Sequence, residues 1–142
     1  MIVKRPRSLW LWALLALILT QLSLWLAVSA HLTILANHGI SFGLLAHTGV
    51  LPTLLETAGV VVVLLAAHWW PTKWVWPEAI VIGGAIGNLL DRLALGAVPD
   101  PLHIAPYPYS FNLADVLIRL GLVVWLGWLA VAALRQRSAQ RP

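Results

Sequence analysis

The chain has 142 residues, 61% of them hydrophobic and only 10% charged, and its mean hydropathy is +0.87. Soluble domains are about 45–50% apolar and about 25% charged, so this composition excludes a soluble globular protein and predicts an integral membrane protein. Cysteine is absent, which excludes disulfides, thiolate metal ligands and thiol nucleophiles, and the net charge of +4 comes mainly from residues flanking apolar segments, which indicates a membrane rather than a nucleic-acid partner.

Four apolar segments each have about the length that a helix needs to cross the hydrocarbon core, so we predict an all-α membrane protein. The predicted spans are Leu9–Ala30, Thr53–Trp70, Pro77–Leu95 and Asn112–Leu134. They leave no room for a soluble second domain, and we treat residues 1–142 as one integral membrane domain. The first span also resembles a secretory signal that ends in small residues at Ala30, but its apolar run is long for a cleaved signal, so we expect it to be retained.

The predicted helix ends carry typical signals. Thr53 and Glu56 have the spacing of a capping box at the start of the second span. Pro77 is a typical first-turn residue, and Gly96 is a typical residue just beyond a helix. The long outer loop 31–51 contains strand-favouring residues and glycines, which predicts a small strand-containing extracytoplasmic cap.

Basic residues indicate the orientation of the spans. Seven of the nine lie before the first span, between the second and third, or after the fourth. With four crossings these positions share one side, which predicts that both termini are cytoplasmic. The other two basic residues and four of the five acids gather toward the opposite side: Arg92, Arg119, Glu56, Asp91, Asp100 and Asp115.

Several polar side chains fall on shared helix faces near that outer side. Asn112 and Asp115 are three residues apart on the fourth span. Three more lie close together on the third span: Asn88, Asp91 and Arg92. An ionisable group at membrane depth costs about 2.5 kcal/mol or more, so these residues predict a functional site. The structural alternative is that Asp91 and Arg92 form a helix-end pair and that Asn112 is an N-cap.

Two carboxylates could meet at this site, because Asp100 lies in the loop between the helices that carry Asp91 and Asp115. Two carboxyls at close range share a proton. The ionised one can then activate a water while the protonated one polarises a carbonyl, which is a design for peptide hydrolysis. No H-x-x-H or H-E-x-x-H spacing occurs, so we predict neither a metal site nor a cofactor.

Three segments resemble the lipoprotein signal peptidases, also called signal peptidase II. The first, GGAIGNLLDRLALGAVPD, covers residues 83–100; the second, FNLAD, covers 111–115; the third, NHGISFG, covers 37–43. The resemblance implies an intramembrane aspartyl endopeptidase of the bacterial cytoplasmic membrane. Such an enzyme removes the signal peptide of a prolipoprotein just before its diacylglyceryl-modified cysteine, with membrane lipid around it.

By position, the resemblance implies that Asp100 and Asp115 are the catalytic pair. It also implies that five residues orient this pair and hold the substrate backbone: Asn37, Asn88, Asp91, Arg92 and Asn112. The loop from His31 corresponds to a small strand cradle over the site.

The chain departs from the family pattern in three places. The family's D-Q-x-[ST]-K element reads TQLSL at residues 20–24, without the acid or the lysine. Pro99 and Pro101 flank Asp100 and remove two backbone donors. Arg119 lies one turn beyond Asp115, where a cation favours the ionised carboxylate. These departures support an alternative, a catalytically silent relative that serves as a subunit or assembly factor of a larger membrane complex.

Overall fold

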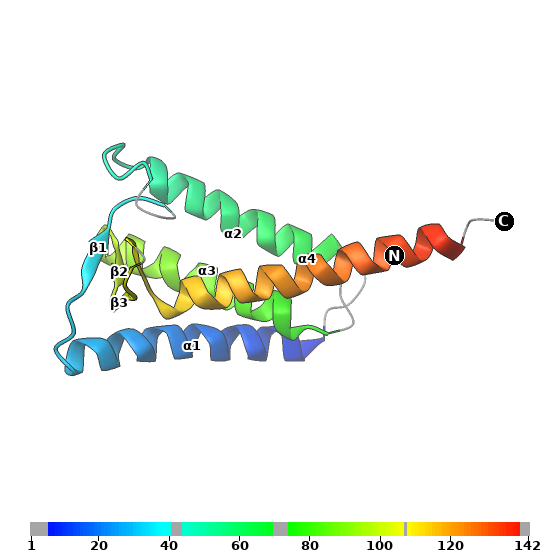
Figure 1. Cartoon of the computed structure of the whole chain (residues 1–142), viewed down its shortest axis with the longest axis horizontal. Helices are drawn as coiled ribbons and strands as arrows, with labels where there is room; N and C mark the ends of the chain where they lie inside the picture. Colours follow the sequence, from blue (N-terminus) through cyan, green and yellow to red (C-terminus); the bar gives the residue numbers. More distant parts are fainter. Residues whose placement is uncertain (1–5, 41–43, 70–73, 107, 140–142) are drawn as a thin grey trace.

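The computed structural model describes residues 6–40, 44–69, 74–106 and 108–139, and it consists of four helices with short strands at one end (Figure 1). The helices are α1 (Arg7–Ser29), α2 (Leu51–Trp69), α3 (Trp76–Leu95) and α4 (Leu113–Ala139). The strands are β1 (Leu35–Asn37), β2 (Val98–Asp100), β3 (Leu102–His103) and β4 (Ser110–Phe111). The predicted four-helix architecture with a strand-containing cap is confirmed.

Three of the described helices are long and apolar enough to cross a membrane: Arg7–Ser29, Leu51–Trp69 and Leu113–Gln136. The fourth helix, α3, has 20 residues, among them the charged Glu78, Asp91 and Arg92. It packs against α1, α2 and α4 (Figure 1). Half of its 20 residues are buried, including Glu78, Asn88 and Arg92, because a central helix can pair polar groups with its neighbours.

Glycines let α3 approach its neighbours closely. A side-chain carbon on Gly83 would lie 2.7 Å from the Cβ of Ala16 on α1, and one on Gly87 would lie 2.7 Å from the hydroxyl of Thr20. These two small residues therefore allow close packing of α3 against α1. Next to these contacts, the core contains Leu9, Ile82 and Trp125.

The helix ends differ from the predictions in two places. α2 begins at Leu51, so Thr53 lies inside the helix and its carbonyl accepts a bond from the Thr57 hydroxyl at 2.8 Å. The predicted capping box there is wrong, and Glu56 has a different partner, Arg92. α4 continues to Ala139, beyond the predicted end of its span, because its last residues are good helix formers although they are not apolar.

The strands form two small antiparallel sheets. β1 pairs with β2, with Leu35 opposite Asp100 and Asn37 opposite Val98. β3 pairs with β4. The cap is therefore shared between the loop after α1 and the segment between α3 and α4, whereas the sequence predicted strands only in the first. Residues 41–43 of the predicted cap lie outside the described residues.

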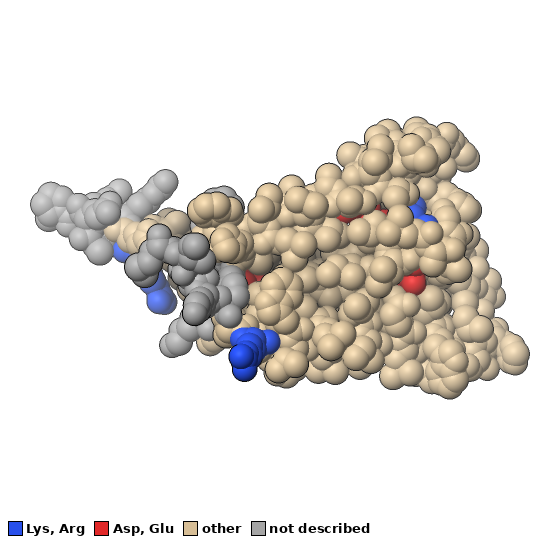
Figure 2. All heavy atoms as spheres, turned by 180° about the vertical axis from the view of Figure 1, so that it is seen from behind, with Lys and Arg blue, Asp and Glu red and all other residues tan. Residues whose placement is uncertain are grey.

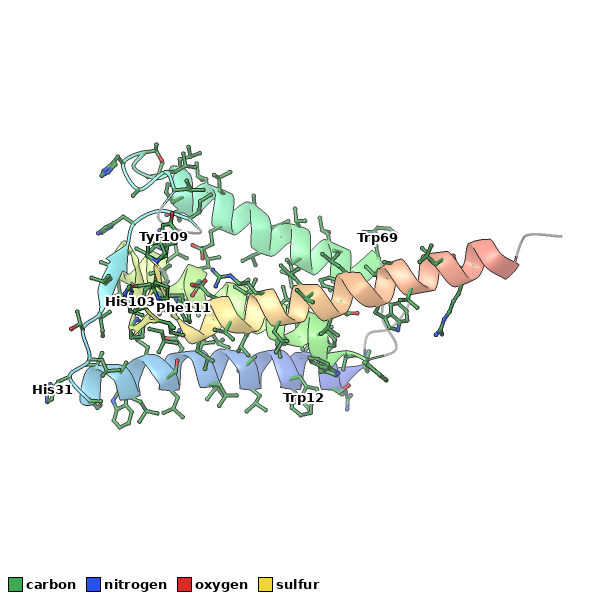
Figure 3. All side chains as sticks on the ribbon, in the orientation of Figure 1. Trp12, His31, Trp69, His103, Tyr109 and Phe111 are labelled. Atoms are coloured by element: carbon green, nitrogen blue, oxygen red, sulfur yellow. The ribbon has the colours of Figure 1, made fainter. Side chains whose placement is uncertain are left out.

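The outside of the molecule is mostly apolar. Tan side chains cover nearly all of the face in Figure 2, with basic groups at the end where α1 begins and α4 ends. Trp12 and Trp69 project outward from α1 and α2 on that half, whereas His31 and His103 lie near the strands (Figure 3). Both described chain ends thus lie at the end opposite the strands, as the predicted even number of crossings requires. Several predicted flanking cations lie outside the described residues: Lys4, Arg5, Lys73 and Arg141.

Candidate active site

Asp100 lies at the end of β2, and its side chain is buried among amides. Its Oδ1 accepts a hydrogen bond from the Asn112 amide at 2.9 Å, and its Oδ2 accepts one from the Asn37 amide at 3.2 Å. The pairing of β2 with β1 brings Asn37 to this position from the loop after α1. Pro101 follows at the point where the chain leaves β2 and continues into β3 of the second sheet.

Asp115 lies in the first turn of α4 and forms a reciprocal cap with Asn112. The backbone N–H of Asp115 donates to Asn112 Oδ1 at 3.0 Å, and the backbone N–H of Asn112 donates to Asp115 Oδ2 at 3.4 Å. Asn112 is therefore the N-cap that the structural alternative predicted. The second oxygen of Asp115 accepts a bond from the Asn88 amide at 3.1 Å.

One asparagine joins the two carboxyl groups. The Asn112 amide donates to both Asp100 and Asn88, and its backbone N–H donates to Asp115. The structure thus brings Asp100, Asp115, Asn37, Asn88 and Asn112 into one hydrogen-bonded network. Asn112 therefore has the predicted structural role as N-cap, and it also bonds to both carboxyl groups of the candidate site.

Asp100 holds its proton more tightly than an ordinary aspartate. Burial raises its pKa to about 6, and the negative charge of Asp115 acts in the same direction. The amides of Asn37 and Asn112 and the charge of Arg92 oppose this rise in pKa. Near pH 6 the site can therefore hold one proton on Asp100, as a pair that combines a general acid with a general base requires.

Arg92 is buried and connects three parts of the chain. Its Nε lies 2.5 Å from Glu56 Oε2 on α2, and its terminal nitrogens donate to the carbonyls of Gly39 at 2.5 Å and Asn37 at 3.4 Å. The structural alternative that paired Arg92 with its neighbour Asp91 is corrected, because Glu56 takes that place. Sequence reasoning missed Glu56 as a site residue, although it is the one acid in the second span.

Asp91 and Arg119 differ in their relation to the site. Asp91 is half-buried and interacts with Gln21 of α1, and it does not line the pocket that Asp115 faces. Arg119 is more exposed and lines that pocket together with Asp115 and Glu56.

The pocket that Asp115 faces has a volume of about 420 Å³ and lies between α2, α3, α4 and the cap. One part of its wall is polar, with Asn37, Asn88 and Asp115, and another part is apolar, with Val63 and Leu122. Asp100 and Asn112 are not in this wall. They lie directly behind it, bonded to Asn37 and Asn88, so the pocket presents Asp115 while Asp100 is covered.

A second cavity of about 800 Å³ begins where the first one ends. It lies between α2 and α4, and Val63 and Leu122 line both. Its other walls are almost entirely apolar and include Trp69, Trp125 and Leu126. Among the described residues, α2 and α4 have little direct contact, so the two cavities form one groove along these helices, and we call it the α2–α4 groove.

The TQLSL segment of residues 20–24 is hydrogen-bonded within α1. The Thr20 hydroxyl donates to the Leu17 carbonyl at 2.7 Å, and the Ser23 hydroxyl donates to the Thr20 carbonyl at 2.7 Å. Thr20 is buried against Gly87, so it serves helix packing and brings no charge to the site. No group of three or more potential metal ligands occurs among the described residues.

Comparison with known proteins agrees with this geometry. A family model described as "Signal peptidase (SPase) II" matches residues 7–131. A lipoprotein signal peptidase of Caldanaerobacter subterraneus subsp. tengcongensis is 33% identical over 103 residues, which cover 71% of this chain and 70% of the relative. One of Acinetobacter baylyi is 32% identical over 138 residues, which cover 80% and 76%. A bacterial membrane enzyme solved at 1.9 Å shares the fold, with a TM-score of 0.71 and 18% identity over 94% of this chain and 97% of that one.

Proposed function

The chain belongs to the signal peptidase II family, the membrane aspartic peptidases that process bacterial lipoproteins, and from this membership we propose how its residues carry out the reaction. We propose that Asp100 and Asp115 are the catalytic pair. The observation that carries this proposal is the hydrogen-bonded network in which Asn112 joins the buried carboxyl of Asp100 to the half-buried carboxyl of Asp115. The proposed substrate is a prolipoprotein, cleaved just before its diacylglyceryl-modified cysteine.

In the proposed mechanism Asp115 is the general base, because it faces the pocket in which a water and the scissile peptide bond can lie. It takes a proton from the water, whose oxygen then attacks the scissile carbonyl carbon. Asp100 donates its proton to the carbonyl oxygen, which stabilises the tetrahedral intermediate. The intermediate collapses when the C–N bond breaks: the proton held by Asp115 passes to the leaving amine, and a hydroxyl of the intermediate returns a proton to Asp100 as the new carboxyl group forms.

Asp100 must be uncovered before it can act, because its side chain is buried behind Asn37 and Asn112, whose amides donate to its two oxygens. We propose that the substrate displaces Asn37, the partner that belongs to the cap, and leaves the bond to Asn112 intact. Asn37 and Arg92 would then be available to hold the substrate backbone. Asn88 would keep Asp115 oriented throughout, and Asp91 would support the outer end of α3 from the side of α1.

The α2–α4 groove suits the apolar part of a signal peptide. It begins at Asp115 and continues between apolar walls toward the opposite end of the helices. We propose that the peptide runs along this groove with its cleavage site at the polar end. Both termini would be cytoplasmic and the strands would lie outside the bacterial inner membrane, as the flanking basic residues predict. Labelling of the two ends from each side of the membrane tests this orientation.

A cleavage assay on a diacylglyceryl-modified prolipoprotein tests the proposed function. The wild-type protein should release the signal peptide, and Asp100→Asn and Asp115→Asn should each lower kcat at least about 10³-fold, since each removes an acid or base that the mechanism requires. Each variant should keep the fold, measured by circular dichroism in detergent. Retained cleavage in Asp100→Asn together with loss in Asp91→Asn would move the catalytic role to Asp91.

Two observations favour the second candidate, a silent relative that acts as a subunit of a membrane complex. Asp100 is covered in this structure, and Thr20 replaces the family's acid at the buried face of α1. Wild-type protein that binds the prolipoprotein without cleaving it would support this candidate. Cleavage that is lost in Asp115→Asn would eliminate it.

A further inference from the structure

The ion pair formed by Glu56 and Arg92 lies beside the proposed catalytic residues, and Glu56 has no role in the mechanism above. Both side chains are mostly out of solvent, with exposed fractions of 15% for Glu56 and 4% for Arg92. Glu56 also lines the pocket that presents Asp115. Burying a charged pair costs desolvation energy that can exceed the attraction between the two charges. Stability alone therefore does not explain this pair.

Arg92 transmits the position of Glu56 to the cap. With its Nε on Glu56, its terminal nitrogens donate to the carbonyls of Asn37 and Gly39. The Gly39 N–H in turn donates to Asn37 Oδ1 at 3.0 Å, which directs the Asn37 amide nitrogen toward Asp100. A continuous path of hydrogen bonds therefore leads from α2, through α3 and the cap, to Asp100.

The pair also sets the charge around the site. Three groups face Asp100 besides Arg92 of α3: Asp115 of α4, Asn37 of the cap and Asn112. Glu56 is faced by Arg92, Asp91 and Asp115, and Arg119 lies in the same pocket wall. The positive charge of Arg92 favours loss of the Asp100 proton, and the carboxylate of Glu56 offsets that charge.

We infer that Glu56 is a positioning residue of the peptidase: through Arg92 it holds the cap over the site, and it neutralises the guanidinium so that Asp100 keeps its proton. This inference rests on the proposed function, because it assigns Asp100 the role of general acid. It differs from a simple structural ion pair, which would affect stability alone. It also differs from a substrate contact by Glu56, which would affect KM alone.

Glu56→Gln separates charge from position, because the amide oxygen still accepts a bond from Arg92 Nε while the negative charge is lost. The alkaline limb of the kcat/KM profile should move to lower pH by about half a unit to one unit, which is a loss of about 3-fold to 10-fold on that limb. Glu56→Asp keeps the charge on a shorter side chain, so the limb should stay near its wild-type pH while kcat falls.

Glu78→Gln is the matched control, since it removes a carboxylate from α3 about 20 Å along the helix from Arg92. Its pH profile should match that of the wild type. An unshifted limb in Glu56→Gln, or an equal shift in Glu56→Asp and Glu78→Gln, would overturn the inference. So would a rise in KM with no change in the pH profile.

An infrared titration tests the inference without cleavage. The carbonyl band of a protonated carboxyl, assigned to Asp100 by its loss in Asp100→Asn, should disappear at lower pH in Glu56→Gln than in the wild type. Absence of that shift overturns the inference whether or not the protein cleaves a prolipoprotein. The expected shift in Glu56→Gln, together with no cleavage of the prolipoprotein by the wild-type protein, would instead refute the proposed function.

Discussion

Asn112 shows how one side chain can organise a site inside a membrane protein. Its side-chain amide nitrogen donates to Asp100 and Asn88, and its side-chain oxygen accepts the Asp115 N–H at the start of α4. Its backbone N–H donates to the Asp115 carboxylate. Every one of these bonds would be costly to leave unmade at a buried position. The same residue that starts the helix therefore fixes the relative placement of the two carboxyls.

The raised pKa of Asp100 has a consequence for stability. Between the ordinary pKa of 3.8 and about 6, the folded protein keeps a proton that the unfolded chain has released. The free energy of unfolding should therefore decrease as pH rises through this window, by an amount on the order of 2–3 kcal/mol. Below the window both states are protonated, and above it both are ionised.

Asp100→Asn should remove this dependence. Thermal unfolding in detergent at pH 4 and pH 7 should show a smaller decrease in Tm with pH for the variant than for the wild type. An unchanged pH dependence of Tm in the variant would show that Asp100 titrates near its ordinary value in the folded protein.

At the scale of elements, α3 is the part of the fold in which packing and chemistry meet. Its glycines bring α1 close, and its polar residues face the cap and α4. Any change that moves α3 away from α1 also moves Asn88 relative to Asp115. The close approach at Gly83 is therefore expected to matter for both stability and activity.

Gly83→Ala should lower the free energy of unfolding by about 1–3 kcal/mol, because the added carbon would collide with the Ala13 carbonyl and the Ala16 side chain. Gly127→Ala on α4 is the control, since nothing lies within 4 Å of a carbon added there. It should leave stability unchanged or raise it by up to about 1 kcal/mol through helix propensity. Chemical denaturation measures both, and equal effects would contradict the packing argument.

The helices could be predicted from sequence because apolar length is a local property, and the strands could not. β2, β3 and β4 have two or three residues each, too few for an alternating pattern, and the prolines at 99 and 101 argued against them. Their pairing with the loop after α1 depends on the way the helices bring the two segments together. The start of α2 was predicted two residues too late. Thr53 and Glu56 have the spacing of a capping box, but the helix already begins at Leu51.

The site was predictable only in part, for a similar reason. The motif residues that lie close in sequence were identified, and the structure places Asn37, Asn88, Asp100, Asn112 and Asp115 in one network. The bond between Glu56 and Arg92 joins residues 36 positions apart on different helices. No spacing rule relates them, so only the packing of α2 against α3 reveals the pair.

At the scale of the whole molecule, the α2–α4 groove joins the polar site to the apolar middle of the bundle. Trp125 lines it with an indole N–H that has no hydrogen-bond partner among the described residues, although its side chain is 3% exposed. Leu126 lines the same groove from α4, whereas Val123 on that helix does not and is 71% exposed. These two positions therefore allow a paired test of substrate placement.

A photoreactive residue at Leu126 should crosslink to the apolar segment of a bound prolipoprotein, with Asp115→Asn used to prevent cleavage. The same residue at Val123 should crosslink to lipid, because that side faces the surroundings of the helix bundle. Mass spectrometry of the adducts identifies the partner. Equal substrate crosslinking from both positions would show that the peptide does not follow the groove.

The scarcity of contact between α2 and α4 affects the route by which a substrate reaches the groove, and so the rate of the reaction. A groove that opens sideways between two helices receives its substrate by diffusion in the plane of the bilayer, and the released signal peptide leaves by the same plane. The quantity that governs the rate is then the number of substrate molecules per lipid, and the volume of the surrounding water does not enter. Added lipid dilutes such an enzyme as added buffer dilutes a soluble one.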